Sequence, residues 1–293
     1  MVERGLKIKI RHHDAVRLDF SKLGLYIVMI LLACFMALPL IYALGTAFKP
    51  LDELLKFPPV FFVRRPTLGN FSQLFLALDS ASVPFLRYLF NSIFVTALAV
   101  AGTIVVATMG GYAMSKLTIP FSKVLFTLVV VAMTFPTNVI QIPLYMIIQW
   151  LGLYNTYAAL VVPRIAGAYG MFLMKQFCDQ LPRPLLEAAR IDGAGEFKIY
   201  MKIALPFLRP AWATLLVFTF TACWNDGAAS LLYISNQSLR LLPVMLTAIS
   251  ENTNLARAGA LAAASFILMA PSLIIFILQQ RKVMATMAHS GIK

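Results

Sequence analysis

Long hydrophobic runs separated by short polar and charged segments dominate the chain. A helix needs about 20 apolar residues to cross a bilayer core of about 30 Å. The pattern therefore predicts an all-α integral membrane protein with six transmembrane helices. We expect these at Leu23–Phe48, Phe90–Met114, Val124–Leu151, Thr156–Phe177, from after Pro210 to about Ile234, and at Ala256–Leu278.

This pattern divides the chain into three parts. Residues 1–22 form an N-terminal segment, residues 23–278 the transmembrane domain, and residues 279–293 a C-terminal tail. The transmembrane domain has a long loop at 49–89 and another at 178–209. The first hydrophobic run follows a mixed-charge stretch and is too long for the apolar region of a signal peptide, so we interpret it as an uncleaved anchor.

The positions of Lys and Arg predict the orientation of the helices. Seventeen lie in residues 1–22, in the turn after the second helix, in the segment 175–209 and in the tail, whereas seven lie mainly in 49–89 and 235–258. Cytoplasmic loops carry the excess of basic residues. We therefore expect both termini and the 178–209 loop to be cytoplasmic, and the 49–89 loop to lie outside.

Composition supports a membrane protein and argues against a nucleic-acid-binding protein. Hydrophobic residues make up 60% of the chain and charged residues 13%, with a mean hydropathy of +0.81. A soluble domain of this length would need more polar surface. The net charge of +13 comes from basic residues between apolar runs, which is a topology signal rather than a clustered basic surface.

Prolines and glycines occur inside the predicted helices. Proline removes a hydrogen bond from the helical ladder, so we expect packing kinks or bends that let the two halves of a pore move, at Pro39, Pro136, Pro143 and Pro163. The paired glycines Gly110-Gly111 and Gly167 with Gly170 predict close helix packing.

The loop at 182–210 has a distinct local pattern. Pro184 suits the first turn of a helix over Leu185–Ile191, which Gly193 and Gly195 should stop. A second helix should begin near Glu196 and end before Pro206. The small side chains of Ala188 and Ala189 would let another protein approach closely, inside a charged rim formed by Glu187, Arg190 and Asp192.

This loop resembles the EAA motif of the permease subunits of ATP-binding-cassette (ABC) importers. The chain matches each fixed position of the motif: Glu187, Ala188 and Ala189, then Gly193 after three residues, Ile203 after nine, and Leu205-Pro206 after one more. The resemblance implies the type I ABC-importer permease fold. It also implies that a coupling helix within Leu185–Ile199 binds a groove of a separate ATPase subunit and transmits its closure to the transmembrane helices.

Other segments resemble the carbohydrate branch of this family, and within it the MalG-like second permease subunit. The segments are Leu68-Gly69-Asn70-Phe71, Asn91-Ser92, Gln141-Ile142-Pro143-Leu144, Gly152-Leu153-Tyr154-Asn155-Thr156 and Trp224-Asn225-Asp226. The ending His289-Ser290-Gly291-Ile292-Lys293 departs from the commoner Gly-Ala-Val-Lys-Gly. It is more similar to importers of oligosaccharides, including uronate-containing pectin or alginate fragments.

The resemblance also implies partners and a location. It predicts a heterodimer with a second permease subunit, two ATPase subunits that bind Mg-ATP, and an extracytoplasmic solute-binding protein, in the bacterial inner membrane. The sequence contains no G-x-x-x-x-G-K-S/T loop, so we expect no P-loop nucleotide site in this chain. No catalytic arrangement or metal spacing is present, since His12, His13 and His289 lie in the predicted cytoplasmic ends and the cysteines are far apart.

Two ionisable residues, Arg164 and Asp226, fall inside the predicted fourth and fifth helices. Charges in a membrane segment are costly and normally face a partner or a cavity. We expect them to pair, either as a structural ion pair or beside a solute path. In the second case Trp224 would offer a sugar ring an aromatic face and Asn225 an amide, and Arg164 could attract a carboxylated sugar.

Three alternative functions remain open at this point. A gradient-driven secondary transporter would show repeated halves and several midplane charges, and the sequence has no clear repeat. A structural or receptor-like membrane subunit would not support ATP hydrolysis stimulated by a binding protein. An ABC permease for a non-sugar solute, such as amino acids or phosphate, differs only in its cargo.

Overall fold

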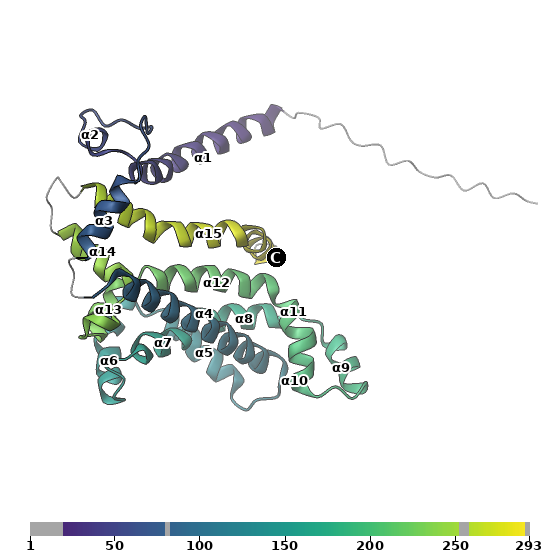
Figure 1. Cartoon of the computed structure of the whole chain (residues 1–293). Helices are drawn as coiled ribbons and strands as arrows, with labels where there is room; N and C mark the ends of the chain where they lie inside the picture. Colours follow the sequence, from purple (N-terminus) through teal and green to yellow (C-terminus); the bar gives the residue numbers. More distant parts are fainter. Residues whose placement is uncertain (1–19, 80–82, 252–257, 291–293) are drawn as a thin grey trace, which may run out of the picture.

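The computed structural model describes residues 20–79, 83–251 and 258–290, and every regular element in these ranges is helical (Figure 1). The elements are α1 (Phe20–Thr46), α2 (Leu51–Leu54), α3 (Gly69–Asp79), α4 (Phe85–Lys116), α5 (Ser122–Met133), α6 (Thr137–Trp150), α7 (Tyr157–Ile165), α8 (Ala168–Asp179), α9 (Arg183–Ile191), α10 (Glu196–Ile199), the π-helical turn η1 (Tyr200–Ala204), α11 (Leu205–Phe207), α12 (Arg209–Trp224), α13 (Gly227–Tyr233), the 3-10 turn η2 (Gln237–Leu239), α14 (Leu242–Glu251) and α15 (Ala258–Ser290).

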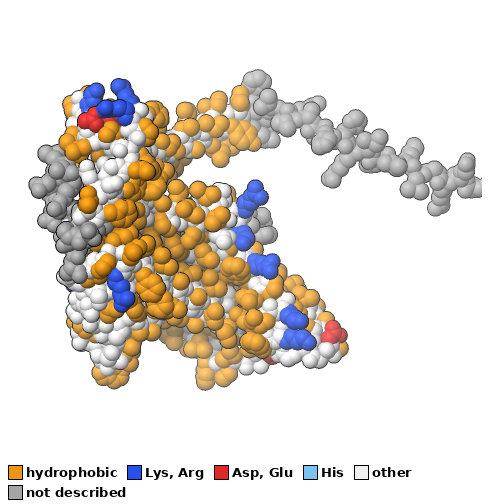
Figure 2. Space-filling view, viewed as in Figure 1, with side chains coloured by type: hydrophobic (Ala, Val, Ile, Leu, Met, Phe, Trp, Pro, Cys, Tyr) orange, Lys and Arg blue, Asp and Glu red, His pale blue; other side chains and the backbone are white. Residues whose placement is uncertain are grey.

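The long helices form a bundle with two different ends. Helix α4 packs against α7, α8 and α12, and α12 packs against α15. Helices α9 and α10 lie at one end of the bundle, together with the C-terminal end of α15, whereas α3, α13 and α14 lie at the other (Figure 1). Hydrophobic side chains cover most of the face between the ends, and basic side chains gather near the ends (Figure 2). Such a surface suits a lipid environment.

Within the described residues, four helical segments are long and apolar enough to cross a membrane, or up to six if each bent pair counts as one span. The four are Leu23–Thr46, Phe85–Lys116, Tyr157–Asp179 and Ala258–Met284. They correspond to the predicted first, second, fourth and sixth helices, although α15 continues well beyond Leu278. The assignment of six spans with cytoplasmic termini remains a prediction, and the segment 1–19 lies outside the described residues.

The third predicted helix is not continuous, which corrects the expected Val124–Leu151. Helix α5 ends at Met133, α6 begins at Thr137, and the two are bent by 113°. Pro136 explains the break, because proline disfavours the helical conformation at the residue before it. By contrast, Pro39, Pro143 and Pro163 lie inside helices α1, α6 and α7.

The fifth predicted helix is also interrupted. Helix α12 ends at Trp224 and α13 begins at Gly227, so Asn225 and Asp226 lie in a break rather than inside a span. The Asp226 carboxylate accepts a hydrogen bond from the Ala229 amide at 3.0 Å. An aspartate that caps a new helix start in this way favours a break over helix continuation.

Glycines bring α4 and α8 together, as the sequence predicts. A Cβ atom on Gly111 would lie 2.8 Å from the backbone nitrogen of Lys175, and one on Gly170 would lie 3.3 Å from the Cβ of Ala107. Only a residue without a side chain fits between two backbones at Gly111. The two helices therefore form one closely packed unit.

The first loop folds back over the end of α1 and buries a charge. Lys49 is 1% exposed, its ammonium donates to the carbonyl of Val60, and it lies 4.4 Å from the centre of the Tyr42 ring. Burial lowers the pKa of Lys49, and nearby Glu53 opposes that shift. Arg65 pairs with Asp52 and Glu53. Lys49 and Glu53 are thus buried, whereas Asp52 and Arg65 remain exposed.

Candidate functional site: the 178–209 loop and the central cavity

Helix α9 forms where the sequence predicts it. Pro184 lies in its first turn, and Leu186 anchors it with a side chain that is buried in the core. Gly193 ends the helix with a φ of +78°, a conformation that residues with a side chain rarely adopt. The Gly193 amide donates to the carbonyl of Arg190 at 3.0 Å, and the Ala194 amide to that of Ala189 at 3.0 Å. These bonds satisfy carbonyls that a helix end leaves free.

The second helix of the loop extends further than predicted. It was expected to end before Pro206, but α10, η1 and α11 continue as one helical segment to Phe207. In the π-helical turn the Leu205 amide bonds to the carbonyl of Tyr200, five residues earlier. The wider turn accommodates the ring of Pro206, which has no amide to donate. The segment then bends by 74° into α12 at Leu208.

The residues of the EAA motif separate into an exposed and a packed group. Ala189, Ile203 and Leu205 pack against the buried cluster that contains Leu186 and Ile199. The other motif residues and the charged rim are exposed: Glu187, Ala188, Arg190, Asp192, Gly193 and Pro206. The motif therefore combines side chains that hold the loop together with side chains that face outward.

Three exposed apolar residues, which the sequence reasoning did not select, extend the outward face of the loop. Leu185 is 48%, Ile191 86% and Phe197 70% exposed. The sequence could have indicated them, because they are large apolar residues within a charged loop, close to its two glycines. We call α9, α10 and the turn between them the knob. Its outward face carries both large apolar and charged side chains, a combination found at protein-binding surfaces.

An ion pair links the two helices of the knob. The Nε atom of Arg190 lies 2.6 Å from Oε1 of Glu196, and the Tyr112 hydroxyl of α4 donates to Oε2 of Glu196 at 3.0 Å. The hydrogen bond to Glu196 raises the pKa of Arg190 above its usual range. Because both sides of the pair are partly exposed, its main effect is to orient the helices rather than to stabilise them strongly.

A cavity of about 690 Å³ is lined by residues of α4, α6, α7, α8, α12 and α13. Such a volume is within the usual range for small-molecule sites. Arg164 and Asp226 both line it and form an ion pair across α7 and the break before α13, which confirms the predicted pairing. Uncharged polar side chains also line the cavity, and the sequence reasoning missed them as site residues: Thr103, Thr137, Gln141, Tyr169, Thr219 and Tyr233.

Asp226 makes two contacts at once. Besides the ion pair, its carboxylate accepts the Ala229 amide and so holds the start of α13. Arg164 lies in the last turn of α7, where a positive charge is favourable beside the free carbonyls. The Thr103 hydroxyl of α4 donates to the Arg164 carbonyl at 3.1 Å. Three helices, α4, α7 and α13, therefore meet at this pair.

Trp224 and Asn225 lie apart from the cavity, which differs from the expectation. Trp224 is 4% exposed, its indole N–H donates to the Leu268 carbonyl at 2.9 Å, and its ring stacks on Phe220. Asn225 is exposed, and its amide donates to the carbonyl of Thr221 at 2.9 Å. Trp224 lies in the last turn of α12, which packs against α15, so its buried ring has no open face for a sugar here.

The described part of the chain contains no group of three or more His, Cys, Asp or Glu residues that could hold a metal ion. The predicted solvated histidines His12 and His13 lie outside the described residues, as does the side chain of His289.

Comparison with known proteins places these features in context. The family described as "Binding-protein-dependent transport system inner membrane component" matches residues 104–282, more than half of the chain. The sulfoquinovosyl glycerol transport system permease protein SmoH of Agrobacterium fabrum is 31% identical over 208 residues, covering 70% of this chain and 71% of that protein. The arabinooligosaccharides transport system permease protein AraQ of Halalkalibacterium halodurans is 28% identical over 261 residues, covering 87% of this chain and 90% of that protein.

The fold matches that of a solved transporter chain. A chain in the crystal structure of a bacterial ABC transporter involved in the import of the acidic polysaccharide alginate superposes with a TM-score of 0.75 at 20% identity, covering 89% of this chain and 95% of that one. This likeness supports the predicted type I permease fold.

Proposed function

The chain belongs to the binding-protein-dependent transport system inner membrane components and is a membrane permease subunit of ABC transporters, and on that premise we propose that it forms one half of the path by which an importer moves an oligosaccharide. In this proposal a separate ATPase supplies the energy, and the chain itself is not an enzyme. The bacterial inner membrane is the proposed location, with both termini and the knob on the cytoplasmic side.

One observation carries the proposal: the knob and the cavity lie towards opposite ends of the same bundle. The knob presents Leu185, Ile191 and Phe197 at one end. The cavity that Arg164 and Asp226 line is bordered by residues of α13, and α13 lies at the other end of the bundle (Figure 1). A solute path that is driven from a distance needs this separation, because the partner that supplies energy and the solute must bind at different places.

The knob residues receive distinct roles in this proposal. Glu187, Ala188, Arg190 and Asp192 would contact the groove of the ATPase, and Gly193 would set the turn between α9 and α10. Ala189, Ile203, Leu205 and Pro206 would instead keep the knob rigid, so that movement of the ATPase reaches the long helices. Two ATPase subunits with Mg-ATP, a second permease subunit and a solute-binding protein complete the proposed importer.

The cargo is proposed to be a carbohydrate, and an oligosaccharide in particular. The relatives SmoH and AraQ are named as permeases for sulfoquinovosyl glycerol and arabinooligosaccharides, and the matched structure is of a transporter involved in alginate import. Hydroxyl and amide side chains such as Thr137, Gln141 and Thr219 suit sugar hydroxyls, since each can donate and accept hydrogen bonds. Arg164 and Asp226 would border this path. The alternative is an ABC permease for a non-sugar solute, and a uronate oligosaccharide is a narrower version of the main proposal.

Reconstitution in proteoliposomes tests the proposal. The chain would be purified with the ATPase, the second permease subunit and the solute-binding protein of the proposed importer. We expect ATP hydrolysis that rises when the loaded binding protein is added, together with uptake of solute. Omission of the ATPase is the control. Uptake driven by an ion gradient without the ATPase would refute the proposal and favour a secondary transporter.

The cargo needs its own measurement. Mass spectrometry of the solute released from the purified binding protein, followed by calorimetry with that solute, would identify it. A neutral or acidic oligosaccharide supports the proposal. An amino acid or phosphate would favour the alternative permease.

A further inference from the structure

Helix α4 connects the knob with the cavity through polar contacts at both places. It runs without a break over the 32 residues from Phe85 to Lys116, and no proline lies inside it. We propose that α4 carries displacement of the knob to the Arg164–Asp226 pair, and that Tyr112 and Lys116 are the positioning residues of this link. The inference rests on the proposed function.

The first part of the link joins α4 to α10 of the knob and to the adjoining turn η1. The Thr108 hydroxyl lies 2.8 Å from the hydroxyl of Tyr200, and both residues are buried. One turn later the Tyr112 hydroxyl donates to Glu196, which pairs with Arg190. Thr108, Tyr112 and Lys116 are spaced by four residues, so they share one face of α4. This face of α4 therefore contacts η1 and then α10.

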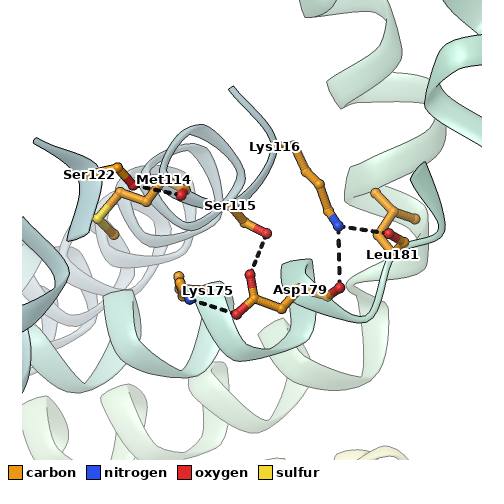
Figure 3. A network of polar contacts seen from close by, with 7 residues as sticks. All are labelled: Met114, Ser115, Lys116, Ser122, Lys175, Asp179 and Leu181. Carbon is orange, nitrogen blue, oxygen red and sulfur yellow. Dashed lines mark hydrogen bonds and ion pairs between the residues drawn. The ribbon is translucent and has the colours of Figure 1, made fainter. Parts of the chain in front are cut away.

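The second part of the link joins the end of α4 to the start of the knob (Figure 3). The Lys116 ammonium donates to the Leu181 carbonyl at 2.7 Å and to the Asp179 carbonyl at 3.2 Å. The Ser115 hydroxyl donates to Oδ1 of Asp179 at 2.6 Å, and Lys175 binds Oδ2 of the same carboxylate at 2.6 Å. Lys116 thus donates hydrogen bonds to the backbone carbonyls at the end of α8 and in the turn that leads into α9.

The third part of the link reaches the cavity. The Thr103 hydroxyl donates to the Arg164 carbonyl, and Arg164 pairs with Asp226 in the cavity wall. Thirteen residues of helix separate Thr103 from Lys116, which is about 20 Å. A continuous helix transmits an axial or tilting movement over that distance. Close packing at Gly111 against α8 keeps α4 from sliding separately.

The covalent route from the knob to α12 differs from this link. It passes through Leu208, where the chain bends by 74° between Phe207 and Arg209. A bend of this kind can absorb movement, because two helical segments can rotate about it. The unbroken α4 has no such joint between the knob and Thr103. This difference is the reason to assign the transmission to α4.

The test uses the complete reconstituted importer with Tyr112→Phe, Lys116→Met and the double variant. Each substitution removes hydrogen-bond donors and keeps most of the side-chain volume. We measure basal hydrolysis, hydrolysis stimulated by the loaded binding protein, solute transported per ATP, and the Tm of the assembled complex. Lys123→Met is the matched control, because Lys123 is an exposed lysine in the first turn of α5, close to the same end of α4.

We expect solute transported per ATP to fall by about two- to thirtyfold in the double variant. Basal hydrolysis should stay near the parent value, and Tm should fall only slightly through the lost hydrogen bonds. Lys123→Met should behave like the parent. Lys116→Arg should keep much of the coupling that Lys116→Met loses, since a guanidinium can also donate to two carbonyls. Tyr112→Phe and Glu196→Ala should be non-additive in the ratio of solute transported to ATP hydrolysed, because each removes one side of the hydrogen bond between Tyr112 and Glu196.

Two results would overturn the inference alone. One is an unchanged ratio of transport to hydrolysis in the double variant. The other is a parallel decline of Tm, hydrolysis and transport, which would mean that the contacts only stabilise the fold. If instead the parent chain fails to bind any ATPase, the proposed function fails, and this inference fails with it.

Discussion

Replacing Asp226 with Asn separates the charge of this residue from its helix-capping role. Asparagine retains an oxygen that can accept the Ala229 amide, so the start of α13 should persist. The negative charge disappears, and Arg164 is left in the cavity wall without its partner. We expect the complex to assemble but to transport poorly.

The size of the effect follows from the exposure of the two side chains. Removing one partner of a fully buried pair costs about 3–5 kcal/mol, and an exposed pair contributes about 0–1 kcal/mol. Arg164 is 34% exposed and Asp226 18%, so the pair lies between these limits. An intermediate cost of about 2 kcal/mol corresponds to roughly a thirtyfold change in a rate or an equilibrium.

Uptake of labelled solute into proteoliposomes is the assay, with complex assembly measured by size-exclusion chromatography. Asp226→Ala should be worse than Asp226→Asn, because it also removes the cap, which contributes about 1 kcal/mol. The double variant Arg164→Gln with Asp226→Asn removes both charges and should recover part of the uptake. Asp226→Asn with parental assembly and uptake would refute the reasoning that the pair matters.

Three further predictions concern single positions. Gly111→Ala should lower the Tm of the complex, because the added Cβ would lie 2.8 Å from the backbone of α8 and overpacking costs about 1–3 kcal/mol. An unchanged Tm would show that the helices can separate at no cost. Gly193→Ala should weaken stimulated hydrolysis, because alanine at a φ of +78° is strained by about 1–2 kcal/mol. Gly193→Asn should weaken it less, and equal effects of the two variants would contradict this account. Trp224→Phe should lower Tm, because it removes the hydrogen bond to the Leu268 carbonyl, which is worth about 1 kcal/mol. The KM for solute should stay unchanged, and a raised KM would place the ring in the solute path.

Sequence reasoning located the knob and the ion pair for clear physical reasons. Glycine and proline restrict the backbone locally, so Pro184 and Gly193 marked the ends of α9 without knowledge of the rest of the fold. A charge in an apolar run is too costly to leave unpaired, so Arg164 and Asp226 could be matched from sequence. Both inferences depend on neighbours in the chain or on a rare residue type.

Other features depend on the direction of helices, which the sequence pattern does not contain. Trp224 and Asp226 are two residues apart, yet one enters the core against Leu268 and the other lines the cavity. Trp224 is the last residue of α12, which packs against α15, whereas Asp226 caps the start of α13. Likewise, Pro206 was expected to stop a helix, but a π-helical turn accommodates it. Hydropathy also could not distinguish the bent pair α5 and α6 from one span.

The amino-acid sequence by itself therefore determined that the chain is an all-α membrane protein, where its hydrophobic runs lie and which loop carries the motif, because these follow from local composition and backbone preference. Only the tertiary structure decided that the unbroken α4 touches Leu181, Glu196, Tyr200 and Arg164. Those contacts join residues that are 61 to 92 positions apart, and distances in space between such residues arise from packing of whole helices rather than from any local pattern.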